Sequence, residues 1–288
     1  MSKVAIITER LSSLSYDFAD KHNITLLPAN VIQDEMVIKD DSDEKSNSFL
    51  KSLDPKGNIP STSTSSIGEV FKLFQEATKD TDQGIYISSS PKLTAFHDVG
   101  VKAAKLLKKQ GKNIQVFNSN LTLSAIGMMA YEASQLSENQ GDVESIMQFL
   151  TTIRDEHRIT EFGVIETLKF LVKNGRIGKA KAWLANIFSF KPIISIKDGE
   201  LDPVTRVRTN DQALETLVRL TREKMESLGS KKLKIMFDYG ISDEYIQEKA
   251  QKRFKEEFDA EIISINQISI AIGCHLGPNI WGLALYFV

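Results

Sequence analysis

Residues 84–118, GIYISSSPKLTAFHDVGVKAAKLLKKQGKNIQVFN, form one unit of strand, helix and strand. Apolar and β-branched runs at residues 84–88 and 114–118 predict two short buried strands. The apolar spacing over residues 94–110 predicts a helix between them. A unit of this kind normally joins two parallel strands. These residues therefore predict an α/β fold with a mostly parallel sheet.

The same alternation continues outward through the first half of the chain. We predict further strands and helices at residues 4–8, 16–22, 24–32, 67–77 and 121–137. Ligands of parallel sheets collect in the loops that follow the carboxyl ends of the strands. The candidate ligand loops are therefore residues 8–13, 88–94 and 118–120.

The pattern changes after a predicted helix at residues 142–158 and a predicted strand at 160–164. Residues 191–201 carry Asp198-Gly199, a dipeptide typical of a hairpin turn. Further on, two predicted strands flank a polar amphipathic helix; the ranges are 233–237, 243–258 and 261–265. We therefore predict two domains. The first, residues 1–159, consists of βα units, and the second, residues 160–288, is an α+β domain with a mixed or antiparallel sheet.

Composition limits the function classes. The chain has 288 residues, and its 36 basic and 38 acidic side chains are interleaved, so no basic face indicates a nucleic-acid partner. No apolar run reaches transmembrane length, which argues against stable insertion into a membrane. The opening apolar run, residues 4–7, is too short for a signal peptide. One cysteine excludes an intramolecular disulfide, and together these features predict a cytoplasmic protein.

Several common motifs are missing from the sequence. It contains no phosphate-binding P-loop, no Gly-x-Gly-x-x-Gly fingerprint, no His-Glu-x-x-His and no Gly-x-Ser-x-Gly elbow. The single cysteine and four scattered histidines do not have the spacing of a metal site. We therefore expect neither a metal nor a cofactor.

Residues 270–279, IAIGCHLGPN, place His275 between two glycines and a proline. Glycine and proline favour a turn, so we predict that this segment presents the imidazole at the edge of a sheet, between two strand-like runs. The alternative is a structural hydrogen bond made by His275. We expect Cys274 to be a small buried residue, and a reactive thiol is the alternative.

Two other segments each allow two interpretations. Residues 60–67, PSTSTSSI, place six hydroxyl residues before a predicted helix. They either form a loop that ends in a helix N-cap at Ser65 or Ser66, or they bind an anion. Arg176, in residues 174–179, NGRIGK, either caps the carbonyls of the preceding helix or supplies a permanent cation for binding.

Taken in order, these segments resemble the DegV family of bacterial lipid-binding proteins, which includes the fatty-acid-binding subunits of bacterial fatty acid kinase. The resemblance extends over nearly the whole chain. Residues 60–63 resemble the family's Pro-x-Thr-Ser loop, and residues 168–179 resemble its most specific central motif. The other matching segments are residues 4–8, 23–28, 190–200 and 273–284.

The resemblance implies a non-catalytic protein that buries one long-chain fatty acid between two domains. By this analogy Thr62 hydrogen-bonds the carboxylate and His275 lies beside it. Arg176 then lies near the head group, where a partner kinase phosphorylates the carboxylate. The ligand-binding residues expected on this basis are Thr62, Ser63, Thr94, Arg176, His275 and Gly277.

The chain departs from the family pattern in two places. Thr8-Glu9-Arg10 replaces the usual Thr-Asp-Ser, and Thr94-Ala95-Phe96 replaces the usual Ser-Gly-Thr. Thr94 keeps a hydroxyl donor, but Ala95 cannot replace a glycine wherever a positive φ is required. Because Phe96 also adds bulk, we predict a ligand site that is shifted or narrowed relative to typical relatives.

Two other functions remain open at this point. The first is an enzyme for a small carboxylated or phosphorylated ligand, with His275 as general acid or base and Arg176 as anion clamp. The second is a divergent relative that has lost lipid binding and acts through protein contacts. A small polar pocket would favour the enzyme, whereas a hydrophobic tunnel would favour the fatty-acid carrier.

Overall fold

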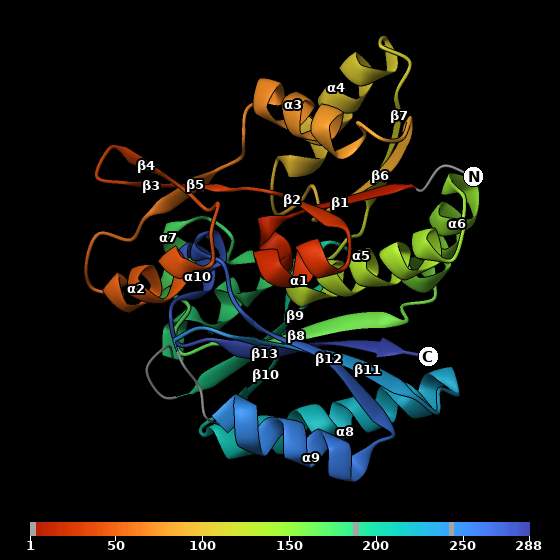
Figure 1. The fold of residues 1–288 in the computed structure, drawn as a ribbon. Coiled ribbons are helices and arrows are strands. Elements are labelled where there is room, and N and C mark those ends of the chain that lie inside the picture. The colour runs from red at the N-terminus through yellow and green to blue at the C-terminus, as the bar shows by residue number, and fades with distance from the viewer. Residues whose placement is uncertain (1–3, 187–189, 242–244) are drawn as a thin grey trace.

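Two large β-sheets, with helices between and outside them, form the computed structural model, which describes residues 4–186, 190–241 and 245–288 (Figure 1). The first sheet has the order β2-β1-β6-β7, and all its strands are parallel. Its strands are β1 (Ala5–Glu9), β2 (Ile24–Leu27), β6 (Gln83–Ser88) and β7 (Asn113–Asn118). The parallel sheet predicted from residues 84–118 is thus confirmed.

Helices cover both faces of this parallel sheet. In Figure 1, α3 (Ile67–Ala77) and α4 (Phe96–Lys108) lie above it, and α1 (Tyr16–Lys21) and α5 (Leu123–Glu138) lie below it. The two central strands, β1 and β6, are buried from both sides, and Ile85, Tyr86 and Ile87 are completely inaccessible to solvent. Such continuous apolar runs are typical of strands in doubly covered parallel sheets.

The second sheet is mixed, with the order β10-β9-β8-β13-β11-β12. Only β11 and β12 pair in parallel. Its strands are β8 (Ile159–Val164), β9 (Lys191–Lys197), β10 (Glu200–Val207), β11 (Leu233–Tyr239), β12 (Ala260–Gln267) and β13 (Trp281–Phe287). Its outer face packs on α8 (Asn210–Leu228) and α9 (Gln251–Glu257), as Figure 1 shows. The predicted mixed sheet is therefore confirmed, and the hairpin at Asp198-Gly199 joins β9 to β10.

Helix α5 lies between the two large sheets and contacts β1 of the first and β8, β11 and β13 of the second. Eleven of its residues are buried, because it packs on both sheets at once. Helix α6 (Val143–Asp155) lies beside it. The apolar side chains of α5 thus join the two halves of the chain into one packed structure.

A small antiparallel sheet, order β4-β3-β5, forms a third element. It contains β3 (Asn30–Gln33), β4 (Met36–Lys39) and β5 (Ser61–Ser63). Around it lie α2 (Glu44–Ser52), α7 (Lys169–Lys173) and α10 (Ile270–Leu276). Helix α10 contacts β3, β5 and α2, so a segment near the C-terminus packs against elements from the first 63 residues.

The remaining short helical segments are η1 (Arg10–Ser12), η2 (Gly178–Asn186) and a π-helical segment, η3 (Tyr245–Ala250). The last precedes α9, so the predicted helix at residues 243–258 is largely present, and residues 243 and 244 lie outside the described residues. Strand β8 begins at the predicted domain boundary. The division at residues 159 and 160 stays a prediction.

Two sequence expectations need correction here. Residues 24–32 form two strands in different sheets, β2 and β3, and not one strand. Pro28 lies between them and has no N–H to donate to a ladder, which explains the break. The long helix α8 was not predicted at all. Its N-cap, Thr209, and its left-handed C-terminal residue, Gly229, are the signals that mark it.

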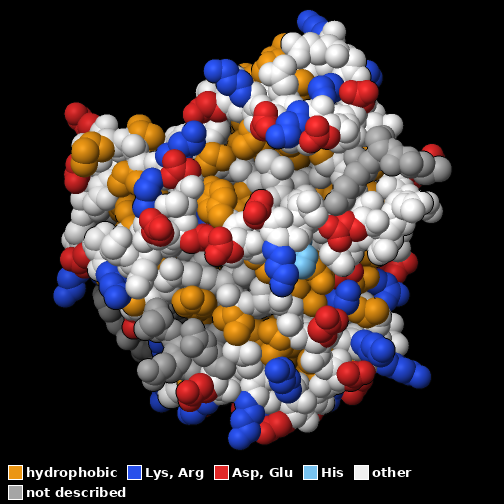
Figure 2. All heavy atoms as spheres, viewed as in Figure 1, with side chains coloured by type: hydrophobic (Ala, Val, Ile, Leu, Met, Phe, Trp, Pro, Cys, Tyr) orange, Lys and Arg blue, Asp and Glu red, His pale blue; other side chains and the backbone are white. Residues whose placement is uncertain are grey.

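The visible surface carries acidic and basic side chains interspersed with small apolar patches (Figure 2). This distribution agrees with the interleaved charges of the sequence. No helix in the described ranges has the length and apolar content needed to cross a membrane.

Candidate functional site

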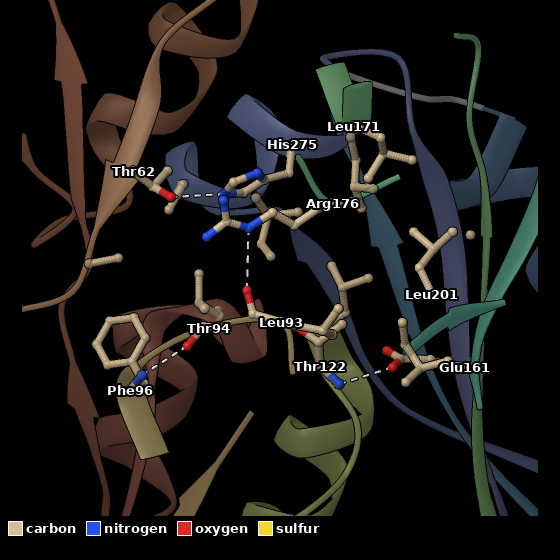
Figure 3. A pocket seen from close by; sticks show the side chains of 18 of the residues that line it. Thr62, Leu93, Thr94, Phe96, Thr122, Glu161, Leu171, Arg176, Leu201 and His275 are labelled. Atoms are coloured by element: carbon tan, nitrogen blue, oxygen red, sulfur yellow. Dashed lines mark hydrogen bonds between the residues drawn. The ribbon is translucent and has the colours of Figure 1, made fainter. Parts of the chain in front are cut away.

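An apolar pocket lies where the small sheet, the loops of the parallel sheet and the mixed sheet meet (Figure 3). Its cavity volume is about 320 Å³. Apolar side chains from the mixed sheet, from α10 and from the helices and loops around them make most of its wall, including Leu11, Leu93, Phe96, Leu123, Leu171, Ile194, Ile196, Leu201, Ile272 and Leu276. The pocket therefore fits a ligand with a substantial apolar part.

Five of the six expected ligand residues line this pocket: Thr62, Ser63, Thr94, Arg176 and His275. The sixth, Gly277, is not among the lining residues. It follows α10 at φ 84°, and a Cβ there would lie 2.8 Å from the Phe170 ring. Glycine is needed at this position to end the helix beside the ring. Direct contact of Gly277 with a ligand stays a prediction.

Thr62 and His275 form the polar end of the pocket. Thr62 Oγ1, in β5, lies 2.8 Å from His275 Nε2, in the last turn of α10. His275 Nδ1 is buried and has no hydrogen-bond partner in the described part of the chain. In a neutral ring only one nitrogen carries a proton. If that proton is on Nε2, it is donated to Thr62, and Nδ1, which has no partner, leaves no buried N–H unpaired. The Thr62 hydroxyl hydrogen is then free to donate to a ligand.

Burial, together with the nearby Arg176 guanidinium, lowers the pKa of His275 to about 4. The imidazole is therefore neutral at neutral pH. It acts on Thr62 as a hydrogen-bonding group, and Arg176 supplies the positive charge at this end of the pocket.

The predicted turn around His275 was wrong, since residues 270–276 are helical. The Ser269 side chain caps this helix by accepting a hydrogen bond from Ile272 N, at 3.2 Å. The apolar run before His275 is therefore a buried helix and not a strand, a distinction that hydrophobicity alone cannot make for short segments. Burial raises the pKa of the Cys274 thiol in this helix to about 12, so the expectation of a buried cysteine is confirmed.

Arg176 lies at the exposed mouth of the pocket. Its Nη1 donates to Asn174 O at 2.6 Å, and its Nε donates to Leu93 O at 3.4 Å. Asn174 is the C-terminal cap residue of α7, so the capping interpretation of Arg176 is confirmed. Within the described ranges, no acidic side chain forms an ion pair with the guanidinium. Its charge is therefore available to an anionic ligand.

Asn174 is a positioning residue that the sequence did not identify. Its amide donates to Cys274 O at 2.8 Å and to Pro60 O at 3.2 Å. It therefore joins α7 both to the segment that carries Thr62 and to the helix that carries His275. The signal was available, because Asn174 stands directly before the Gly175-Arg176 pair.

In the hydroxyl-rich segment before α3, the last residues cap the helix and earlier residues line the pocket. The Ser66 side chain caps α3 in a capping box with Glu69, which confirms the N-cap prediction. Ser65 Oγ donates to Pro28 O at 2.8 Å. Thr62 and Ser63 lie earlier in the segment and line the pocket.

Thr94-Ala95-Phe96, the second departure from the family pattern, lies in the pocket wall. Thr94 Oγ1 accepts a hydrogen bond from Phe96 N at 3.0 Å, and its own hydrogen can still be donated. Ala95 has φ −90°, so this backbone does not require glycine. The Phe96 ring lines the pocket. The predicted shift or narrowing of the site stays a prediction.

Thr8-Glu9-Arg10, the first departure from the family pattern, is not among the residues that line the pocket. Arg10 is buried and pairs with Asp40 and Asp43, at 3.3 and 2.7 Å. Glu9 accepts hydrogen bonds from Ser89 N and from the Tyr86 hydroxyl. Burial raises the pKa of Glu9 to about 7. Arg10 thus holds the loop after β1 in place, and Glu9 ties the end of β1 to β6 and to the loop that follows it.

Glu161, in β8, is a further polar lining residue that the sequence did not identify. It is only 3% exposed. Its Oε1 accepts from Thr122 N at 2.9 Å, while its Oε2 has no hydrogen-bond partner among the described residues. Burial raises the pKa of this carboxyl well above its usual range, and the nearby Asp238 raises it further. The only sequence signal was an acidic residue inside a predicted buried strand.

No group of three or more histidine, cysteine, aspartate or glutamate side chains within the described ranges could hold a metal ion. The pocket combines an apolar wall, hydroxyl groups, the buried Glu161 carboxyl and the Arg176 cation.

Comparison with known proteins places this arrangement in a family. The model of the DegV family, described as an uncharacterised protein, matches residues 3–288. The chain belongs to the DegV family. Curated DegV domain-containing proteins match over nearly their whole length. One from Streptococcus pneumoniae is 25% identical over 288 residues, covering 100% of this chain and 99% of its own. One from Staphylococcus aureus is 27% identical over 286 residues, covering 99% of each.

Solved DegV structures share the fold. A Thermus thermophilus DegV protein described by its fatty acid binding superposes with a TM-score of 0.90 at 22% identity, covering 99% of this chain and 100% of its own. A Eubacterium ventriosum protein described as binding stearic acid superposes with a TM-score of 0.89 at 20% identity, covering 99% of this chain and 98% of its own. Bacillus subtilis DegV, described as a fatty acid binding protein, gives 0.84 at 22% identity, covering both chains fully. The predicted DegV resemblance and fold class are thus confirmed.

Proposed function

We propose that this DegV protein is a non-catalytic carrier of one long-chain fatty acid. The observation that carries the proposal is the composition of the pocket, in which hydroxyl donors and a cation gather at one end of a mainly apolar wall. The fatty acids named for its structural relatives support the same ligand class.

The polar end suits a carboxylate. With His275 neutral and donating to Thr62, the Thr62 hydroxyl can donate to a carboxylate oxygen, and the Thr94 hydroxyl can donate from the neighbouring loop. Arg176 adds a positive charge at the mouth. The two hydroxyl donors offset the cost of moving a carboxylate out of water, which is several kcal/mol when the charge is unpaired.

The apolar wall supplies the binding free energy. Each buried methylene contributes about 0.8 kcal/mol. About twelve buried methylenes therefore contribute roughly 10 kcal/mol before the costs of association and ordering. This is enough to retain the ligand tightly without a covalent bond.

We further propose that the bound carboxylate is presented to a fatty acid kinase. The partner would transfer the terminal phosphoryl group of ATP to a carboxylate oxygen, giving an acyl phosphate and ADP. A second, more open hollow adjoins the pocket mouth and shares with it Leu93, Thr94, Ala95, Arg176 and Leu201. Such a surface would let a kinase reach the head group while the acyl chain stays buried.

A chain-length series tests the carrier function. Delipidated protein is titrated with saturated fatty acids from six to eighteen carbons. We expect one site, with an affinity that rises up to about fourfold for each added methylene until the pocket is full. Equal affinity for short and long acids would contradict the carrier and favour an enzyme for small carboxylates. No binding at any length would favour a relative that acts through protein contacts.

A further inference from the structure

The pocket has a second polar position, away from the carboxylate end. Figure 3 shows Glu161 and Thr122 on the opposite side of the pocket from Thr62 and His275. The proposed carrier function accounts only for the polar groups at the Thr62 end of the pocket. A simple alkyl chain offers nothing to a polar group at the other end.

Glu161 is held firmly in this position. It projects from a central strand of the mixed sheet, and its Oε1 accepts from Thr122 N at 2.9 Å, at the start of α5. Leu123, the next residue, has φ 47°. A bulky side chain rarely adopts this conformation, and such strain is often found at binding sites.

The second oxygen of Glu161 is left without a partner. Oε2 is buried in the pocket wall, and no described residue hydrogen-bonds to it. Thr122 also lines the pocket and is half-buried. An unmodified acyl chain would leave Glu161 Oε2 without a hydrogen-bond partner, and leaving a buried polar group unpaired is costly.

A hydroxyl group on the ligand fits this position. It can donate and accept at once, so it can pair with Glu161 in either protonation state. The raised pKa of Glu161 favours the neutral acid, which carries no charge to repel the fatty acid. A second carboxylate on the ligand would instead bring a buried charge that faces no cation here.

We propose that the pocket is selective for a fatty acid whose chain carries a hydroxyl group, with Glu161 Oε2 as the hydrogen-bond partner of that hydroxyl. This inference rests on the proposed function, because it assumes that the carboxylate lies at the Thr62 end. It names the substrate class within the long-chain fatty acids. The position of the hydroxyl along the chain is then set by the span between Thr62 and Glu161.

The test is a binding series with stearic acid and its monohydroxy derivatives, substituted at carbons 2, 6, 8, 10, 12, 14 and 18. We expect one chain position to bind at least about tenfold more tightly than stearic acid, which is about 1.4 kcal/mol. The 2-hydroxy acid is an internal control, since its hydroxyl stays at the head group.

Two variants of Glu161 separate hydrogen bonding from shape. Glu161→Gln keeps a neutral polar group of the same size and should keep the preferred position. Glu161→Met is apolar and unbranched, so it should lose the preference and bind stearic acid more tightly than the wild type does. If Glu161→Met fails to fold, the wild-type series still overturns the inference when no hydroxystearic acid binds more tightly than stearic acid.

The outcomes distinguish this inference from the carrier function. Tight one-to-one binding of stearic acid, with no hydroxystearic acid bound more tightly, would overturn the inference and leave the carrier intact. A hydroxyl preference that survives in Glu161→Met would also overturn it. Binding of no C18 acid would overturn both proposals.

Discussion

Thr62 and His275 are 213 positions apart in the sequence, yet Thr62 Oγ1 and His275 Nε2 lie 2.8 Å from each other. One belongs to the small N-terminal sheet and the other to α10, near the C-terminus. The polar end of the pocket therefore exists only when α10 is packed against β5. Binding at this end and the packing of the C-terminal segment depend on the same contact.

The hydroxyl of Thr62 is the first group to test. We expect Thr62→Ala to weaken fatty-acid binding by about 1 to 3 kcal/mol, because a hydrogen bond to a charged carboxylate is lost. Thr62→Ser keeps the hydroxyl and should bind nearly as well as the wild type. Titration of delipidated protein measures both. Unchanged affinity in Thr62→Ala would remove this residue from the site.

Arg176 should act after binding. It is exposed at the pocket mouth, and solvent-exposed charges contribute little to affinity. We expect Arg176→Ala to bind fatty acid normally but to be a poor substrate for the partner kinase, measured as acyl phosphate formed per unit time. The control is Lys173→Ala, which removes another exposed cation at the end of α7. Phosphorylation of Arg176→Ala at the wild-type rate would refute the role.

Asn174 should matter for both stability and binding. Its amide holds Pro60 O and Cys274 O, so Asn174→Ala leaves two carbonyls without this donor. We expect the free energy of unfolding to fall by about 1 to 2 kcal/mol and fatty-acid affinity to fall with it. Denaturant titration and lipid binding measure the two effects.

Asn139→Ala provides the matched control for Asn174→Ala. Asn139 is an exposed cap residue at the end of α5, away from the pocket. If both variants lost the same stability and neither lost affinity, Asn174 would have no special positioning role.

Glu9 should make stability depend on pH. Its pKa is about 7 in the folded protein and 4.5 in an ordinary carboxyl. The folded state therefore holds the proton more tightly, and its stability falls as the pH rises from 4.5 to 7. The full difference is about 3 kcal/mol.

Glu9→Gln removes this titration and can still accept from Ser89 N. The variant should therefore gain stability relative to the wild type as the pH rises, with no further gain above about pH 8. Unfolding curves at pH 4.5, 6, 7 and 8 measure the difference. Parallel pH profiles for the two proteins would show that Glu9 does not titrate in this window.

Local patterns predicted most of the fold. The strand and helix periods over residues 84–118 mark the parallel sheet, and Asp198-Gly199 marks the β9–β10 hairpin. The same reasoning gave a wrong prediction for residues 270–276, because a short buried helix and a short buried strand have the same apolar composition. Long-range packing decides between them, and here α10 is held by α2, α7 and β5.

Some residues of the site could also be predicted from the sequence, and others could not. Motif order identified Thr62, Arg176 and His275, which lie in segments with unusual glycine, proline or hydroxyl content. Glu161 gave no such signal, because its place in the pocket lining and its buried oxygen, which has no hydrogen-bond partner among the described residues, exist only in the folded chain.

The most direct test of the carrier function is mass spectrometry of an organic extract from protein purified without added lipid. A control protein from the same cells is extracted in parallel. We predict one fatty acid of 14 to 18 carbons per chain, absent from the control. An extract that contains no fatty acid, both as purified and after incubation with fatty acids, would contradict the account.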